Sequence, residues 1–127
     1  MMNHRLPELR KALLALHKAL VHSERTNYEK VIGTIPSPNH FLQLLARDPW
    51  FAWLHPLFQL IVTMDEALEQ EEPLTKREVE ALEKQVRQLL LVSETGDDMS
   101  KHYFDALQRD PDVVLAHADV RKVLRKA

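Results

Sequence analysis

The chain contains no cysteine and only two glycines, Gly33 and Gly96, among its 127 residues. The lack of cysteine excludes disulfides, thiolate metal ligands and thiol catalysis. Scarce glycine argues against β-sandwiches, barrels and phosphate-binding loops, which need glycine where the backbone turns tightly or approaches a ligand. The remaining composition is that of an ordinary globular protein, long enough to form one domain with a buried core.

Strong charge and long apolar runs are also missing. The formal net charge is −2, so no long-range field draws the protein toward nucleic acid or an anionic membrane. The most apolar stretch, Trp50 to Met64, is interrupted by His55 and Gln59 and is shorter than the ~20 residues of a membrane span. The amino terminus breaks its apolar residues with charges, unlike a signal peptide. We therefore expect a cytoplasmic protein without nucleic-acid or membrane partners.

The spacing of apolar residues predicts an all-α fold. Near the amino terminus, leucines recur at alternating gaps of three and four, which places them on one helical stripe. They are Leu6, Leu9, Leu13, Leu16 and Leu20. Gly33 can end this helix in a left-handed cap, and a second stripe begins at Val79 after a capping box of Thr75 and Glu78. No stretch shows sustained alternation of β-branched residues, so we expect a bundle of about five helices.

The sequence also suggests an internal repeat. Residues 40–55 (HFLQLLARDPWFAWLH) match residues 102–117 (HYFDALQRDPDVVLAH) at six of sixteen positions. Each copy predicts the same order, in which a long helix is followed by a short helix, Arg-Asp-Pro and another helix. Two such units within one domain, residues 1–127, suggest pseudo-twofold packing. Chance and shared capping chemistry would explain the identities equally well.

Three dipeptides place a capping side chain before a proline at the first helical position. They are Ser37-Pro38, Asp48-Pro49 and Asp110-Pro111. In the two Arg-Asp-Pro segments, each aspartate is expected to cap the following helix. Arg47 and Arg109 are each expected to end the preceding helix and to complement its dipole.

Residues 48–60, DPWFAWLHPLFQL, concentrate much of the aromatic bulk of the chain. On a helical wheel, the apolar arc of residues 49–70 covers roughly 220°, about twice the width expected of a surface helix. Such a helix is either central to the bundle or partly covered by a second chain. Pro56 cannot donate to the carbonyl of Ala52 and disfavours helical geometry at His55. We therefore expect a kink, or a new helix that starts at Pro56.

Two functional hypotheses centre on this segment. The first is a non-enzymatic interaction or regulatory module that binds a second copy, as a dimer, or another protein, because aromatic and arginine side chains are enriched at interface centres. Its surface would comprise Arg47, Trp50, Trp53, His55, Phe58 and Met64. The alternative is a small-ligand pocket at the Pro56 kink, lined by Trp50 and Trp53. Its polar anchors would be His40, His55 or Asp65.

Seven histidines raise the question of a metal site. Neither the Glu-x-x-His pairs of di-iron bundles nor the His-Glu-x-x-His of zinc proteases is present. Helical spacing gathers Asp98, His102 and Asp105 on one face, and His40 could join them if the two halves pack together. Ordinary hydrogen-bonded histidines are the alternative, so no cofactor is expected. With no nucleophile elbow or phosphate loop, no enzyme activity is indicated.

Four basic residues lie near the carboxyl terminus. They are Arg121, Lys122, Arg125 and Lys126. At the last turns of a helix such cations complement the dipole, and they could also contact an acidic partner. Four charges do not make a nucleic-acid footprint.

Residues 37–65, SPNHFLQLLARDPWFAWLHPLFQLIVTMD, resemble a group of short bacterial proteins described only as hypothetical. The shared features are a Ser-Pro opening, Asp-Pro-Trp-Phe-Ala-Trp-Leu, a Pro-Leu, and an Ile-Val before an aspartate. The resemblance extends through Leu115-Ala116-His117. It implies a bacterial cytosolic helical protein and transfers no functional residue.

Overall fold

The computed structural model describes residues 5–91 and 96–125. Over these residues the chain forms six α-helices and one 3-10 helix and no strand, which confirms the predicted all-α fold. The elements are α1 (Arg5–Val31), α2 (Pro38–Arg47), η2 (Pro49–Leu54), α3 (His55–Glu69), α4 (Lys76–Leu89), α5 (Asp98–Arg109) and α6 (Pro111–Arg125). The helix count is close to the five expected.

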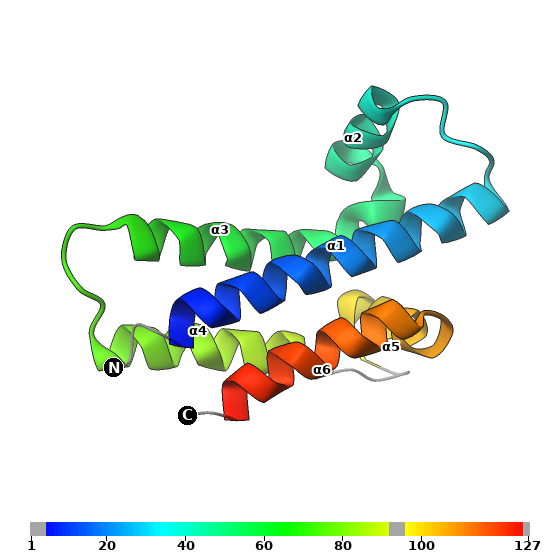
Figure 1. Cartoon of the computed structure of the whole chain (residues 1–127). Coiled ribbons are helices and arrows are strands. Elements are labelled where there is room, and N and C mark those ends of the chain that lie inside the picture. The colour runs from blue at the N-terminus through cyan, green and yellow to red at the C-terminus, as the bar shows by residue number, and fades with distance from the viewer. Residues whose placement is uncertain (1–4, 92–95, 126–127) are drawn as a thin grey trace.

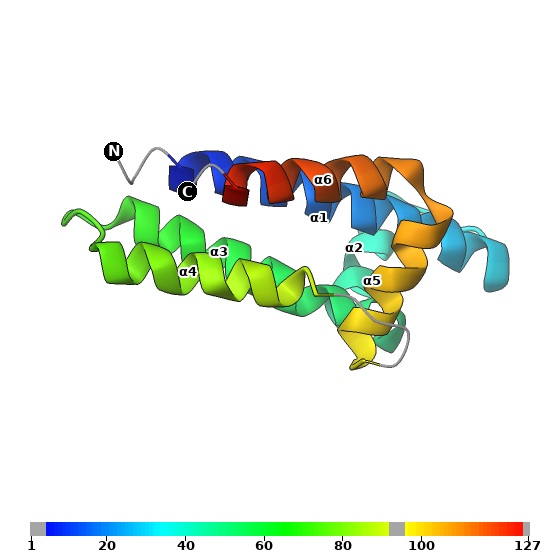
Figure 2. The same ribbon diagram turned by 90° about the horizontal axis from the view of Figure 1, so that it is seen from below.

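Helix α1 is the centre of the arrangement. It packs along α6 on one side and against α3 on the other, while α4 lies beside α3 (Figure 1). Seen from below, α5 runs across the long helices near one end of the bundle, and α2 lies behind them (Figure 2). The chain order is α1–α2–η2–α3 and then α4–α5–α6, so that a 3-10 helix follows the first Arg-Asp-Pro and an α-helix follows the second.

The helix starts are specified by local capping, as predicted. Each aspartate or serine before a proline accepts a backbone N–H: Ser37 from His40 at 3.1 Å, Asp48 from Trp50 at 2.9 Å, and Asp110 from Asp112 at 2.9 Å. Thr75 and Glu78 form both hydrogen bonds of a capping box at the start of α4. Gly33 has a φ of 143° just beyond α1, in the region that favours glycine.

The leucine stripe of α1 forms the middle of the core. All five of its leucines are at most 1% exposed. Phe51 of η2 and Leu57 and Met64 of α3 pack into the same cluster. Burial of each such side chain contributes about 1.5–3 kcal/mol. Within residues 5–91 and 96–125, no helix combines the length and apolar character needed to cross a membrane.

The proline in the middle of the aromatic segment separates two helices. The 3-10 helix η2 ends at Leu54 and α3 begins at His55, so the expected break is confirmed. The expectation that His55 leaves helical geometry is wrong, since its φ and ψ are −60° and −40°. In the first turn of a helix, proline lacks only an N–H that would be unpaired anyway. The Ala52 carbonyl keeps a partner, because the His55 N–H donates to it.

Candidate functional site

The six residues predicted as one interaction surface do not form one. Trp53 and Met64 are 5% and 0% exposed and belong to the core. Trp50 is half-buried, whereas His55, Phe58 and Arg47 are exposed. The physical reason is that η2 is contacted by α1, α2, α3 and α5, and α3 by α1 and α4. The chain therefore covers most of the wide apolar arc itself.

The two tryptophans hold helices together. The Trp50 ring meets the Tyr28 ring of α1 edge-on, with centroids 5.4 Å apart. The Trp53 ring stacks on His102 of α5 at 5.4 Å, with an angle of 18° between the planes. Neither indole N–H finds an acceptor among the described residues. The arrangement makes both tryptophans packing residues of η2, and it ties His102 to Trp53.

A hollow of about 400 Å³ does lie beside the break at Pro56. We call it the α2–α3 groove. It is lined by His17, Val21, Leu42, Leu45, Ala46, Phe51, Leu54, His55, Phe58 and Gln59. No acidic or basic residue other than histidine lines it. Burial lowers the pKa of His17 below its usual 6.5, so that this imidazole is neutral at pH 7.

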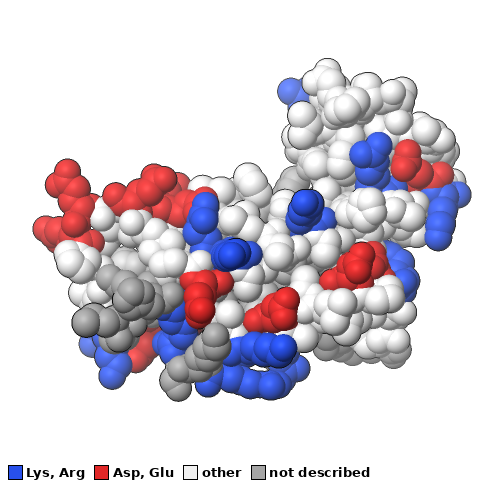
Figure 3. Space-filling model, in the orientation of Figure 1, with Lys and Arg blue, Asp and Glu red and all other residues white. Residues whose placement is uncertain are grey.

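Helix α2 packs against η2, and its Phe41 ring meets the Phe51 ring edge-on with centroids 5.7 Å apart. No α2 residue is buried. The His55 Nε2 atom hydrogen-bonds the Leu45 carbonyl at 2.9 Å, and the Arg25 guanidinium lies 4.8 Å from the centre of the Phe41 ring. The surface over α2 is mainly uncharged, whereas acidic side chains gather near the far end of α3 (Figure 3). The groove is therefore mainly apolar.

The sequence predicted a pocket near Pro56, but most of the residues proposed to line it do not line this hollow. Neither tryptophan lines it, and of the three proposed polar anchors only His55 does. Asp65 instead forms an ion pair with Arg10 of α1, and His40 is exposed on α2. His17 was missed, because its only sequence signal is a polar residue beside the leucine stripe.

The proposed metal ligands are not brought together. Asp98, His102 and Asp105 share α5, but all three are exposed. His40 lies on α2, outside any such cluster. Among the described residues, no three histidine or carboxylate side chains are grouped as metal binding requires. Spacing on one helix face did not predict a cluster here.

The two Arg-Asp-Pro segments share their caps but not the role of their arginines. Arg109 reaches across to α1, where its Nη2 lies 2.7 Å from Glu24 Oε2 and its Nε donates to Ser23 Oγ at 3.2 Å. Glu24 is 3% exposed. Arg47 is exposed, and no ion pair in the described part of the chain includes it. The expectation that both arginines mainly serve their own helix ends is wrong for Arg109.

His117 of α6 forms a partly buried polar pair with Tyr103 of α5. The Tyr103 hydroxyl lies 2.6 Å from His117 Nδ1. Burial raises the pKa of Tyr103, and burial together with the nearby Arg121 lowers the pKa of His117. Both groups are therefore neutral at pH 7, and a hydrogen bond between uncharged groups joins the tyrosine oxygen to the imidazole nitrogen.

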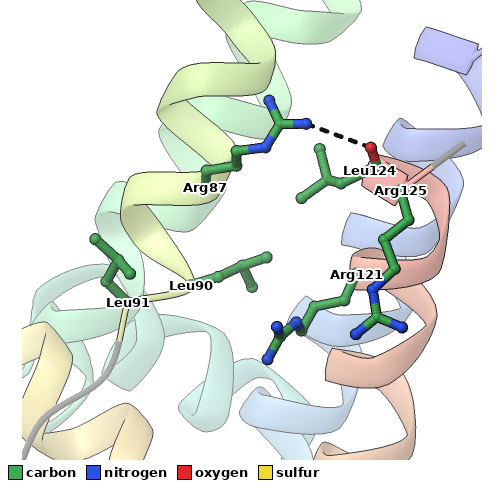
Figure 4. Close-up of a pocket in the computed structure, with 6 residues that line it drawn as sticks. All are labelled: Arg87, Leu90, Leu91, Arg121, Leu124 and Arg125. Carbon is green, nitrogen blue, oxygen red and sulfur yellow. Dashed lines mark hydrogen bonds between the residues drawn. The ribbon is translucent and has the colours of Figure 1, made fainter. Parts of the chain in front are cut away.

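A second hollow, of about 410 Å³, lies where the end of α4 faces the last turns of α6 (Figure 4). We call it the arginine cleft. It is lined by Arg87, Leu90, Leu91, Arg121, Leu124 and Arg125. Arg87 donates to the Leu124 carbonyl at 3.3 Å across the cleft. The sequence identified the basic carboxyl-terminal turns but not their juxtaposition with Arg87.

Comparison of the chain with protein-family models, curated proteins and solved structures found no match. The case for a function therefore depends on the geometry of these sites.

Proposed function

We propose that this chain is a non-enzymatic interaction module that self-associates through the α2–α3 groove and its rim. The observation that supports this most directly is the exposure of two large apolar side chains beside the hollow. Leu42 on α2 is 63% exposed and Phe58 on α3 is 50% exposed. Exposed apolar groups that adjoin an apolar hollow are typical of protein-binding surfaces.

The charge of the groove favours a second copy as the partner. A twofold contact brings a surface patch against itself, so any net charge on the patch would repel its own image. The groove lining has no acidic or basic residue apart from histidines, and His17 is neutral at pH 7 because its pKa is lowered. Burial of both Phe58 rings would contribute about 1.5–3 kcal/mol for each ring.

The resemblance of residues 37–65 to short bacterial proteins supports a bacterial cytosolic setting for such a module.

Sedimentation equilibrium over a wide concentration range tests this proposal. We expect the average mass of the unmodified protein to rise toward that of a dimer. Phe58→Glu and Leu42→Glu should each shift the equilibrium to monomer, because each places a charge against its symmetry mate. Both side chains are exposed, so the variants should fold.

Leu115→Glu is the matched control. Leu115 is 65% exposed on α6 and does not line the groove, so this variant should dimerise like the unmodified protein. A protein that stays monomeric at the highest concentration contradicts the proposal. Equal loss of association in all three variants would contradict the assignment to the groove.

The size of the groove also favours a second candidate, a small apolar ligand. Ligand pockets of proteins span about 300–1,000 Å³ and combine apolar walls with a few polar groups, and here the polar groups are His17, His55 and Gln59. Ala46→Trp would fill the hollow. Saturable binding of an apolar fluorescent probe by the monomer, abolished in this variant, would favour the ligand. Absence of saturable binding would rule it out.

A further inference from the structure

The bundle is open along one edge. Helix α1 packs against both α3 and α6, and α3 packs against α4, but α4 and α6 do not pack closely on each other. The arginine cleft occupies this gap. The hydrogen bond from Arg87 to the Leu124 carbonyl joins the two helices across it (Figure 4). The hollow is therefore a consequence of the helix arrangement.

Positive charge gathers in the cleft. Arg87 comes from α4, whereas Arg121 and Arg125 come from α6. In the described part of the chain, no carboxylate forms an ion pair with any of the three. Glu83, one turn before Arg87, is 2% exposed and is paired with Arg5. All three side chains are exposed, so water and salt weaken their mutual repulsion, and an anion placed between them would attract all three.

The rest of the cleft is apolar. Leu124 is buried and Leu90 is half-buried. Leu91, by contrast, is 72% exposed. Leu91 and the exposed part of Leu90 would gain free energy if an apolar group covered them. The combination indicates an anion that carries an apolar portion.

The helix dipole does not by itself explain the cluster. Cations near the carboxyl end of α6 are favoured by the dipole wherever they point. Lys122 lies in the same turn as Arg121 and serves the dipole equally, yet it does not line the cleft. The two residues that do line it are arginines, whose planar guanidinium matches the oxygens of a phosphate.

We propose that the arginine cleft binds an organic phosphate. The guanidinium groups of Arg121 and Arg125, together with the free N–H groups of Arg87, hold the phosphate oxygens. Leu90, Leu91 and Leu124 cover the apolar part. A phosphate dianion offsets most of the local positive charge, which a single carboxylate would not. This site lies on different helices from the α2–α3 groove. The outcome of the phosphate-binding test is therefore independent of the outcome of the self-association test.

His117 provides a readout that does not depend on a reaction. It lies one turn before Arg121, and that guanidinium contributes to its lowered pKa. A phosphate bound at Arg121 offsets this positive charge, so the pKa of His117 should rise on binding. Arg121→Gln should also raise the pKa of His117, and phosphate should then change it little. Both shifts are measurable by NMR titration of the imidazole.

Binding itself is tested on the full chain with hexyl phosphate and inorganic phosphate, by calorimetry. We expect hexyl phosphate to bind more than tenfold more tightly, at about fourfold for each buried methylene. Arg121→Gln and Arg125→Gln should each weaken binding of hexyl phosphate by about tenfold or more, the value of a hydrogen bond to a charged group. Lys122→Gln is the matched control, with the same charge change on the same helix, and should alter binding less than about twofold.

Vesicles of phosphatidylcholine with and without phosphatidic acid distinguish the two sources of the phosphate. Binding to phosphatidic acid that requires Arg121 but not Lys122 assigns a lipid headgroup. Saturable hexyl phosphate binding without vesicle binding assigns a free organic phosphate. The proposal is overturned if no phosphate binds saturably, if Lys122→Gln weakens binding as much as Arg121→Gln, or if hexyl phosphate binds no better than inorganic phosphate.

Discussion

Replacement of Arg109 by methionine should destabilise the protein far more than the same replacement at Arg47. The two arginines occupy equivalent positions in the Arg-Asp-Pro segments. Only Arg109 pairs with a buried carboxylate, Glu24 of α1, which is 3% exposed. Arg109→Met leaves that carboxylate in the core without a positively charged partner. The preceding residue, Ser23, has only an uncharged hydroxyl and cannot replace the lost guanidinium.

The magnitude follows from the geometry. At the 2.7 Å between Nη2 and Oε2 and an effective dielectric constant of about 20, the attraction is roughly 6 kcal/mol. Desolvation of the two ions offsets part of this, and the Arg109 side chain is 31% exposed, which screens the pair. Loss of one partner of a buried pair costs about 3–5 kcal/mol, and the partial exposure favours the lower end. We expect Arg109→Met to lower the free energy of unfolding by about 3 kcal/mol.

Urea unfolding monitored by circular dichroism measures this difference. Arg47→Met should change the free energy of unfolding by less than about 0.5 kcal/mol, as for other exposed positions. The double variant Glu24→Met, Arg109→Met should regain most of the loss, because an apolar pair of similar volume needs no partner. Equal effects at Arg47 and Arg109, or a double variant as unstable as the single one, would refute this reasoning.

Two further outcomes follow from burial. Met64→Ala should lower the free energy of unfolding by about 2–5 kcal/mol because the side chain is fully buried. Phe58→Ala, measured in the monomer, should lower it less. Similar urea midpoints for the two variants would be inconsistent with the placement of α3. Lowered pKa values at His17 and His117 mean that the folded protein binds fewer protons than the unfolded chain below pH 6.5. Stability should therefore be full above pH 6.5 and fall as pH drops through that value toward the lowered pKa values. Thermal unfolding at a series of pH values measures this loss of stability, which should be smaller in His17→Gln. The control is His22→Gln, an exposed position on the same helix. If His22→Gln reduces the loss by the same amount, burial of His17 is not its cause.

Helix positions were predictable from the sequence because their determinants are local. The Asp48 and Thr75 caps bond to backbone groups two and three residues away, so adjacent residues suffice to specify them. The leucine stripe of α1 is likewise a periodicity within one segment. The break before α3 follows from Pro56 alone. These signals were enough for the all-α fold and for the break before α3.

Which side chains meet was decided only by tertiary packing. Arg47 and Arg109 have the same local sequence, but only Arg109 faces α1 across the bundle. The sequence placed Trp53 and Met64 in a predicted surface, but the surrounding helices bury both side chains. The arginine cleft combines α4 with α6, which no spacing within either helix could indicate. Capping energies depend on a few adjacent residues, whereas burial and charge clusters depend on how distant segments pack. For that reason the sequence determined the helices, and only the tertiary structure decided which side chains lie together in the candidate sites.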